Sequence, residues 1–178
     1  MNTANILTLT RILLMPIYLI VFYSNLENKI MYAGMILILA GITDILDGYI
    51  ARKYDMVTKL GTALDPVSDK ITTFVVLISF ASANIIPTWI LIVLGLKEAF
   101  LIMGGVILYY HGDKEVIPAN KFGKIATTSF YIAVISGILN FPNTIVYILF
   151  YIVVVLHLIA FINYLFIFTS IIKDKNRI

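Results

Sequence analysis

The sequence predicts an all-α integral membrane protein with six transmembrane helices and both termini in the cytoplasm. The first reason is composition: of the 178 residues, 61% are hydrophobic and 13% are charged, whereas a soluble domain is about 45–50% apolar and about 25% charged. A chain this short could not bury so many apolar side chains in water. A soluble globular protein and a disordered chain are therefore both excluded.

The second reason is a series of six long apolar segments. A helix needs about 20 mostly apolar residues to cross about 30 Å of hydrocarbon, and six stretches come close to this length. They cover residues 5–23, 30–51, 61–82, 88–110, 122–139 and 144–172. Internal repeats are absent, and the length suits one domain, so we expect a single membrane domain over residues 1–178.

The third reason is the distribution of basic residues, which gather after every second segment. These residues are Arg52, Lys53 and Lys59, then Lys114, Lys121 and Lys124, and finally Lys173, Lys175 and Arg177. Cytoplasmic loops are the ones enriched in Lys and Arg, so this pattern predicts cytoplasmic termini and an even number of spans. Residues 1–5 lack the basic region of a cleavable signal peptide, and we expect the first segment to stay in the mature protein.

Several classes of chemistry are excluded by composition. The chain has no cysteine, which excludes disulfides, thiolate metal sites and thiol catalysis. No basic stripe interleaves with aromatic residues, so nucleic acid is not an expected partner.

Four aspartates cluster on the second and third segments, and ionisable residues in a membrane are costly enough to indicate a function. Asp44 and Asp47 lie one helical turn apart, as do Asp65 and Asp69. Because the connection between the two segments is short, their helices are expected to be antiparallel neighbours. The four carboxylates should then converge below the cytoplasmic surface. A purely structural cluster is the less favoured alternative, because four acids in lipid cost too much for packing alone.

Four converging carboxylates need cations. Repulsion and desolvation would otherwise keep some of them protonated, and two divalent ions would supply the matching charge. All-oxygen ligands select hard ions such as Mg²⁺ or Mn²⁺. Pairs of such ions, about 3.5–4 Å apart, are used for phosphoryl transfer.

The spacing of these residues resembles the signature of the CDP-alcohol phosphotransferase family. The pattern is Asp44-x2-Asp47-Gly48-x2-Ala51-Arg52-x8-Gly61-x3-Asp65-x3-Asp69. In the first segment, Asn5-x2-Thr8-x2-Arg11 is similar to the N-terminal motif of the phosphatidylglycerophosphate and cardiolipin synthase branch. The resemblance implies a six-helix enzyme of the cell (inner) membrane, usually a homodimer. Such enzymes transfer a phosphatidyl group from CDP-diacylglycerol to an alcohol and release CMP on the cytoplasmic side.

The resemblance also implies roles for individual residues. The four aspartates would ligate two divalent ions, Mg²⁺ or Mn²⁺, and Asp69 would also act as general base for the acceptor hydroxyl. The CDP-binding residues would be Asn5, Thr8, Arg11, Gly48, Ala51, Arg52 and Gly61. Two alternatives stay open: Arg11 could contact the aspartates or extend to the interface, and Asn5 could be only a helix cap.

The acceptor alcohol is the least constrained part of the prediction. Lys97, Lys121 and Lys124 are candidates to bind its phosphate, although the last two could simply be cytoplasmic anchors. Glycerol 3-phosphate is the preferred acceptor. Relatives that use it commonly carry a second arginine where this chain has Gly105, and this departure favours phosphatidylglycerol as the alternative.

A different class, an ion-coupled transporter, would also place acids in the membrane. It is disfavoured because the acids lie in one hairpin and no inverted repeat is visible.

Overall fold

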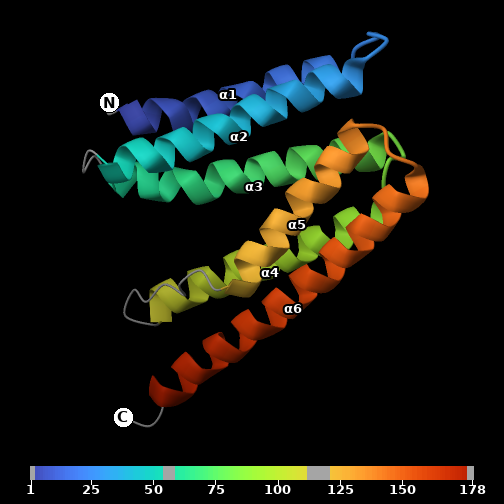
Figure 1. Cartoon of the computed structure of the whole chain (residues 1–178). Coiled ribbons are helices and arrows are strands. Elements are labelled where there is room, and N and C mark those ends of the chain that lie inside the picture. The colour runs from blue at the N-terminus through green and yellow to red at the C-terminus, as the bar shows by residue number, and fades with distance from the viewer. Residues whose placement is uncertain (1–2, 54–58, 112–120, 176–178) are drawn as a thin grey trace. The chain divides into compact units, whose positions relative to one another are not determined.

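All six expected helices are present in the computed structural model, which describes residues 3–53, 59–111 and 121–175 and no strand among them (Figure 1). They are α1 (Thr3–Phe22), α2 (Lys29–Lys53), α3 (Lys59–Ser82), α4 (Thr88–His111), α5 (Lys121–Ile138) and α6 (Asn143–Lys175). The side chains of some residues near the helix ends lie outside this description. The prediction of an all-helical chain with six helices is confirmed.

The helices form two compact units, Met1–Ser82 and Ala83–Ile178. In the first unit, α1 packs against both α2 and α3. The rings of Phe22 and Phe80 stack with centroids 6.3 Å apart, and the hydroxyl groups of Tyr23 and Ser82 are 2.7 Å apart. These contacts join the C-terminal ends of α1 and α3, so the two helices run parallel, with α2 antiparallel to them.

In the second unit, α6 packs against both α4 and α5. Trp89 of α4 stacks on Tyr151 of α6 at 5.6 Å between ring centroids, and Phe130 of α5 meets Phe150 of α6 edge-on at 6.3 Å. Small residues on α5, Ala126 and Ala133, are buried. The second unit is thus built around α6, which contacts α4 and α5 through neighbouring aromatic residues.

The end of α5 is defined by a left-handed residue. Asn140 has a φ of 53°, its N–H donates to the carbonyl of Gly137 at 3.2 Å, and the N–H of Phe141 donates to Ser136 at 3.0 Å. This pair of bonds is a Schellman motif, which satisfies carbonyls that the helix end would leave unpaired. Pro142 follows and its carbonyl accepts the N–H of Ile145 at 2.8 Å, in the first turn of α6.

One described stretch, Asn143–Ser170 of α6, is long and apolar enough to cross a membrane unaided. Leu9–Phe22 of α1 is apolar but shorter. In α3 and α4, charged residues such as Asp69 and Lys97 interrupt the apolar runs. The number of helices therefore agrees with the sequence, while the crossing of a membrane by all six stays a prediction.

Replacing Asn140 tests the role of its left-handed conformation. Asn140→Ala should lower the free energy of unfolding by about 1 kcal/mol, because alanine adopts positive φ less readily than asparagine. Asn140→Gly should leave stability unchanged or raise it, since glycine adopts this φ without steric cost. Unfolding in SDS followed by circular dichroism measures both. An equal loss in the two variants would contradict the explanation.

Candidate active site

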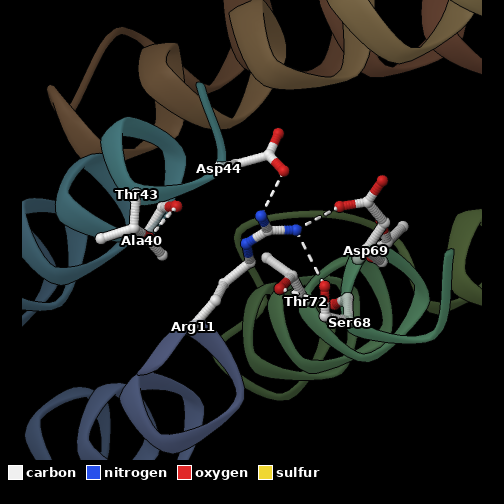
Figure 2. Close-up of polar contacts among 8 residues, drawn as sticks. Arg11, Ala40, Thr43, Asp44, Ser68, Asp69 and Thr72 are labelled. Carbon is white, nitrogen blue, oxygen red and sulfur yellow. Dashed lines mark hydrogen bonds and ion pairs between the residues drawn. The ribbon is translucent and has the colours of Figure 1, made fainter. Parts of the chain in front are cut away.

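Arg11 of α1 lies at the centre of a polar cluster in the first unit (Figure 2). Its Nη2 forms an ion pair with Asp44 of α2. Its Nη1 contacts Oδ1 of Asp69 on α3 at 2.9 Å and donates a hydrogen bond to Oγ of Ser68 at 2.8 Å. One guanidinium therefore joins all three helices of the unit.

The order of the helices explains why these residues meet. Arg11 is in the first half of α1, Asp44 in the second half of α2 and Asp69 in the first half of α3. Because α1 and α3 run parallel and α2 runs against them, these three positions lie at the same end of the unit. Asp44 precedes the exposed Lys53 at the end of α2 by nine residues, which is roughly 13 Å along the helix axis at 1.5 Å per residue.

Neighbouring hydroxyl groups donate to their own helices. Thr72 donates to the carbonyl of Ser68 and Thr73 to that of Asp69, both at 2.9 Å. On α2, Thr43 donates to the carbonyl of Ala40 at 2.7 Å (Figure 2). These bonds use the threonine donors within each helix. The acceptors that Arg11 contacts are Ser68 and the two carboxylates.

The burial of the ion pairs is unequal. The Arg11 side chain is 3% exposed, while those of Asp44 and Asp69 are 49% and 54% exposed. Arg11 Nε is buried without a hydrogen-bond partner in the part of the chain that the structure describes. A buried guanidinium is tolerated only when nearby anions compensate its lost hydration. Arg11 therefore depends on the aspartates, whereas each aspartate keeps an exposed side.

The outer carboxylate oxygens suit a divalent cation. Figure 2 shows that the second oxygen of Asp44 and of Asp69 points away from Arg11. One guanidinium against two carboxylates leaves a net charge of −1 for these three side chains, which favours a further cation. Carboxylate oxygens are the ligands that Mg²⁺ and Mn²⁺ prefer. No group of three or more metal-ligating side chains occurs among the described residues, so a complete site needs ligands beyond them.

Other predicted site residues are described only as backbone. Asp47 lies on α2 and Asp65 on α3, each one turn from its partner aspartate, but their side chains are outside the described residues. The same holds for the remaining CDP-binding candidates, which are Asn5, Thr8, Gly48, Ala51, Arg52 and Gly61. The convergence of four carboxylates and the composition of a CDP pocket stay predictions.

The acceptor candidates belong to the second unit. Lys97 and Glu98 are both buried on α4 and form an ion pair with each other. Lys121 and Lys124 are exposed in the first turn of α5. A contact between any of these lysines and a phosphate group stays a prediction.

Ser68 is a site residue that the sequence analysis did not identify. It is 1% exposed and accepts a hydrogen bond from Arg11. Its place directly before Asp69 was the available signal, but a serine in a helix commonly bonds its own backbone instead.

Comparison with known proteins assigns the family. The model of the CDP-alcohol phosphatidyltransferase family matches residues 1–167, and the chain belongs to this family. The family consists of membrane-bound transferases that generally use a divalent metal ion. The chain is therefore a transferase of a membrane-bound family. The resemblance inferred from the aspartate motif is confirmed.

Individual relatives extend over most of the chain. A Haemophilus influenzae protein is 31% identical over 173 residues, covering 92% of this chain and 91% of its own length. A Bacillus subtilis protein is 34% identical over 151 residues (78% and 77%) and an Aquifex aeolicus protein 33% over 144 residues (79% and 78%). All three are named CDP-diacylglycerol–glycerol-3-phosphate 3-phosphatidyltransferase.

The ion pair between Lys97 and Glu98 on α4 can be tested by its effect on the free energy of unfolding. Lys97→Met leaves the Glu98 carboxylate buried without its neighbouring cation, and should cost about 3–5 kcal/mol of unfolding free energy. Glu98→Gln should be destabilising for the converse reason. The double variant Lys97→Met/Glu98→Gln should lose much less than the sum of the two single losses. SDS unfolding of the four proteins measures this coupling, and additive losses would contradict the pairing.

Proposed function

We propose that this protein is a CDP-diacylglycerol–glycerol-3-phosphate 3-phosphatidyltransferase, a phosphatidylglycerophosphate synthase of phospholipid biosynthesis. The observation that carries the proposal is that relatives matching most of the chain bear this name. The contacts of Asp44 on α2 and Asp69 on α3 with the same Arg11 side chain, at motif positions of the family, support it structurally. A transporter is set aside because the family consists of transferases.

In this proposal the aspartates assemble the catalytic centre. Asp44, Asp47, Asp65 and Asp69 hold two divalent ions, Mg²⁺ or Mn²⁺. When bound, the ions would supply positive charge against the diphosphate of the donor and would lower the pKa of the acceptor hydroxyl. Asp69 accepts the proton of that hydroxyl, whose oxygen attacks the β-phosphorus of CDP-diacylglycerol. The bond from this phosphorus to the CMP oxygen breaks, and CMP leaves without a covalent enzyme intermediate.

The donor and acceptor are assigned to different parts of the chain. Asn5, Thr8, Gly48, Ala51, Arg52 and Gly61 contact the CDP group, with Arg52 pairing with a phosphate. Lys97, Lys121 and Lys124 serve the phosphate of the acceptor. Arg11, expected at the nucleotide or the aspartates, contacts the aspartates in the structure.

The second candidate function is a cardiolipin synthase, in which phosphatidylglycerol replaces glycerol 3-phosphate. The observation in its favour is Gly105, at a position where relatives that use glycerol 3-phosphate commonly carry arginine. The two reactions share the donor, the ions and CMP, so only the acceptor separates them.

We further propose that the chain works as a single domain and a homodimer in the cell (inner) membrane. All six helices cross the bilayer, both termini are cytoplasmic, and the aspartate site opens to the cytoplasm. The family match over residues 1–167 supports one domain, since it spans both compact units. The clustering of basic residues after α2, after α4 and at the end of the chain supports the orientation.

The decisive experiment offers the acceptors separately. Purified protein with Mg²⁺ and cytidine-labelled CDP-diacylglycerol should release labelled CMP when glycerol 3-phosphate is added. EDTA should stop release, and added Mg²⁺ or Mn²⁺ should restore it. Release with phosphatidylglycerol alone would replace the proposal by cardiolipin synthesis. No release with either acceptor would reject both.

Asp69→Asn tests the assignment of the base and ligand. The variant keeps the shape of the side chain but removes its charge and basicity, so CMP release should fall at least about 100-fold. Glu27→Gln, in the exposed turn between α1 and α2, is the matched control and should retain full activity. Activity of Asp69→Asn near that of the wild type would reject the role, provided the variant purifies as a folded protein.

A further inference from the structure

Arg11 and a divalent ion would require the same carboxylates. Both Arg11 contacts to acids use Oδ1 atoms, one on Asp44 and one on Asp69. These two residues are the described members of the expected metal site. An ion bound to them would lie within a few ångströms of the guanidinium, because its bonds to oxygen are short.

The electrostatic consequence follows from the two charges. Arginine keeps its positive charge under all ordinary conditions, and like charges placed close together oppose each other. Without a metal ion, Arg11 neutralises part of the carboxylate charge and stabilises the cluster. With a metal ion, the same charge works against binding.

Burial holds Arg11 in this position. Its side chain is 3% exposed, and the bond from Nη1 to the buried Ser68 anchors it on α3 independently of the carboxylates. A buried arginine with such an anchor cannot withdraw into solvent as a surface side chain would. The competition is therefore built into the packing of α1 against α2 and α3.

We propose that Arg11 is an internal counter-cation of the aspartate site, which stabilises the site without metal and lowers its affinity for divalent ions. The inference rests on the proposed function, because that function supplies the metal site. It predicts that loss of the Arg11 charge tightens metal binding. A residue that only oriented the aspartates for the ion would have the opposite effect.

The test compares Mn²⁺ binding to four proteins in detergent, followed by the electron paramagnetic resonance signal of unbound Mn²⁺. Arg11→Gln removes the charge and should lower the dissociation constant by a factor in the range of about 5–150, typical of coupled binding. Arg11→Lys keeps the charge but reaches only one carboxylate, so its dissociation constant should fall between those of the wild type and Arg11→Gln. Lys29→Gln is the matched control, since it also removes one positive charge but at the start of α2, at the opposite end of the unit from Asp44, and it should bind Mn²⁺ like the wild type.

A second readout follows stability. In EDTA, Arg11→Gln should aggregate at a lower temperature than the wild type. Size-exclusion chromatography after heating measures this temperature, because the peak of the dispersed protein shrinks as aggregates form. Saturating Mn²⁺ should raise that temperature more in Arg11→Gln than in the wild type, because the ion replaces the missing charge. If Arg11→Gln cannot be purified, Arg11→Lys carries the test with the same direction of change.

The outcomes separate this inference from the proposed function. Equal or weaker Mn²⁺ binding in the Arg11 variants would overturn the inference, even if the wild type releases CMP with glycerol 3-phosphate. Wild-type protein that releases CMP but binds no Mn²⁺ would overturn it as well. Tighter binding in both variants, with no CMP release by the wild type with either acceptor, would uphold the inference and reject the proposed function.

Discussion

The arrangement of the first unit depends on the cost of burying one guanidinium. Arg11 is almost fully buried on α1, and a buried cation is stable only beside anions and hydrogen-bond acceptors. Those partners come from two other helices, Asp44 on α2 and the pair Ser68 and Asp69 on α3. The electrostatic requirement of a single side chain thus holds the register of three helices at the end where the candidate site lies.

The same interaction keeps the site accessible. The Arg11 side chain is the buried partner in both ion pairs, and Asp44 and Asp69 remain half-exposed. Their second oxygens point away from Arg11 (Figure 2). The far end of the unit is closed by apolar packing instead, with Phe22 stacked on Phe80 and Tyr18 beside Phe22. The polar contacts of Arg11 and the aromatic contacts between α1 and α3 therefore lie at opposite ends of the unit.

The second unit follows another physical rule. Its helices are held by aromatic pairs along α6, such as Trp89 with Tyr151 and Phe130 with Phe150, which need no charge. Its buried Lys97 and Glu98 compensate each other within one helix, unlike Arg11, whose partners are on other helices. The loss of Arg11 would remove the polar contacts that join α1, α2 and α3 at the candidate site.

The sequence by itself determined the helical class, the six helices and the aspartate motif. Composition and the length of apolar runs dictate helices in a membrane family, and acids at fixed spacing indicate shared chemistry. The sequence also placed the end of the fifth segment at residue 139, and the residue that follows, Asn140, is of a type common after a helix C-terminus. Helix ends and motifs depend on residues close together in the chain, which is why sequence analysis finds them.

Only the tertiary structure decided what Arg11 contacts. The sequence left the nucleotide, the aspartates and the interface open, since these choices differ in which helices meet and at what level. Ser68 was missed for the same reason: its partner is 57 positions away in the chain. The packing of α1 against α2 and α3 brings Arg11 to Asp44 and Asp69. The buried guanidinium of Arg11 needs these ion pairs, because it has lost the water that would otherwise stabilise its charge.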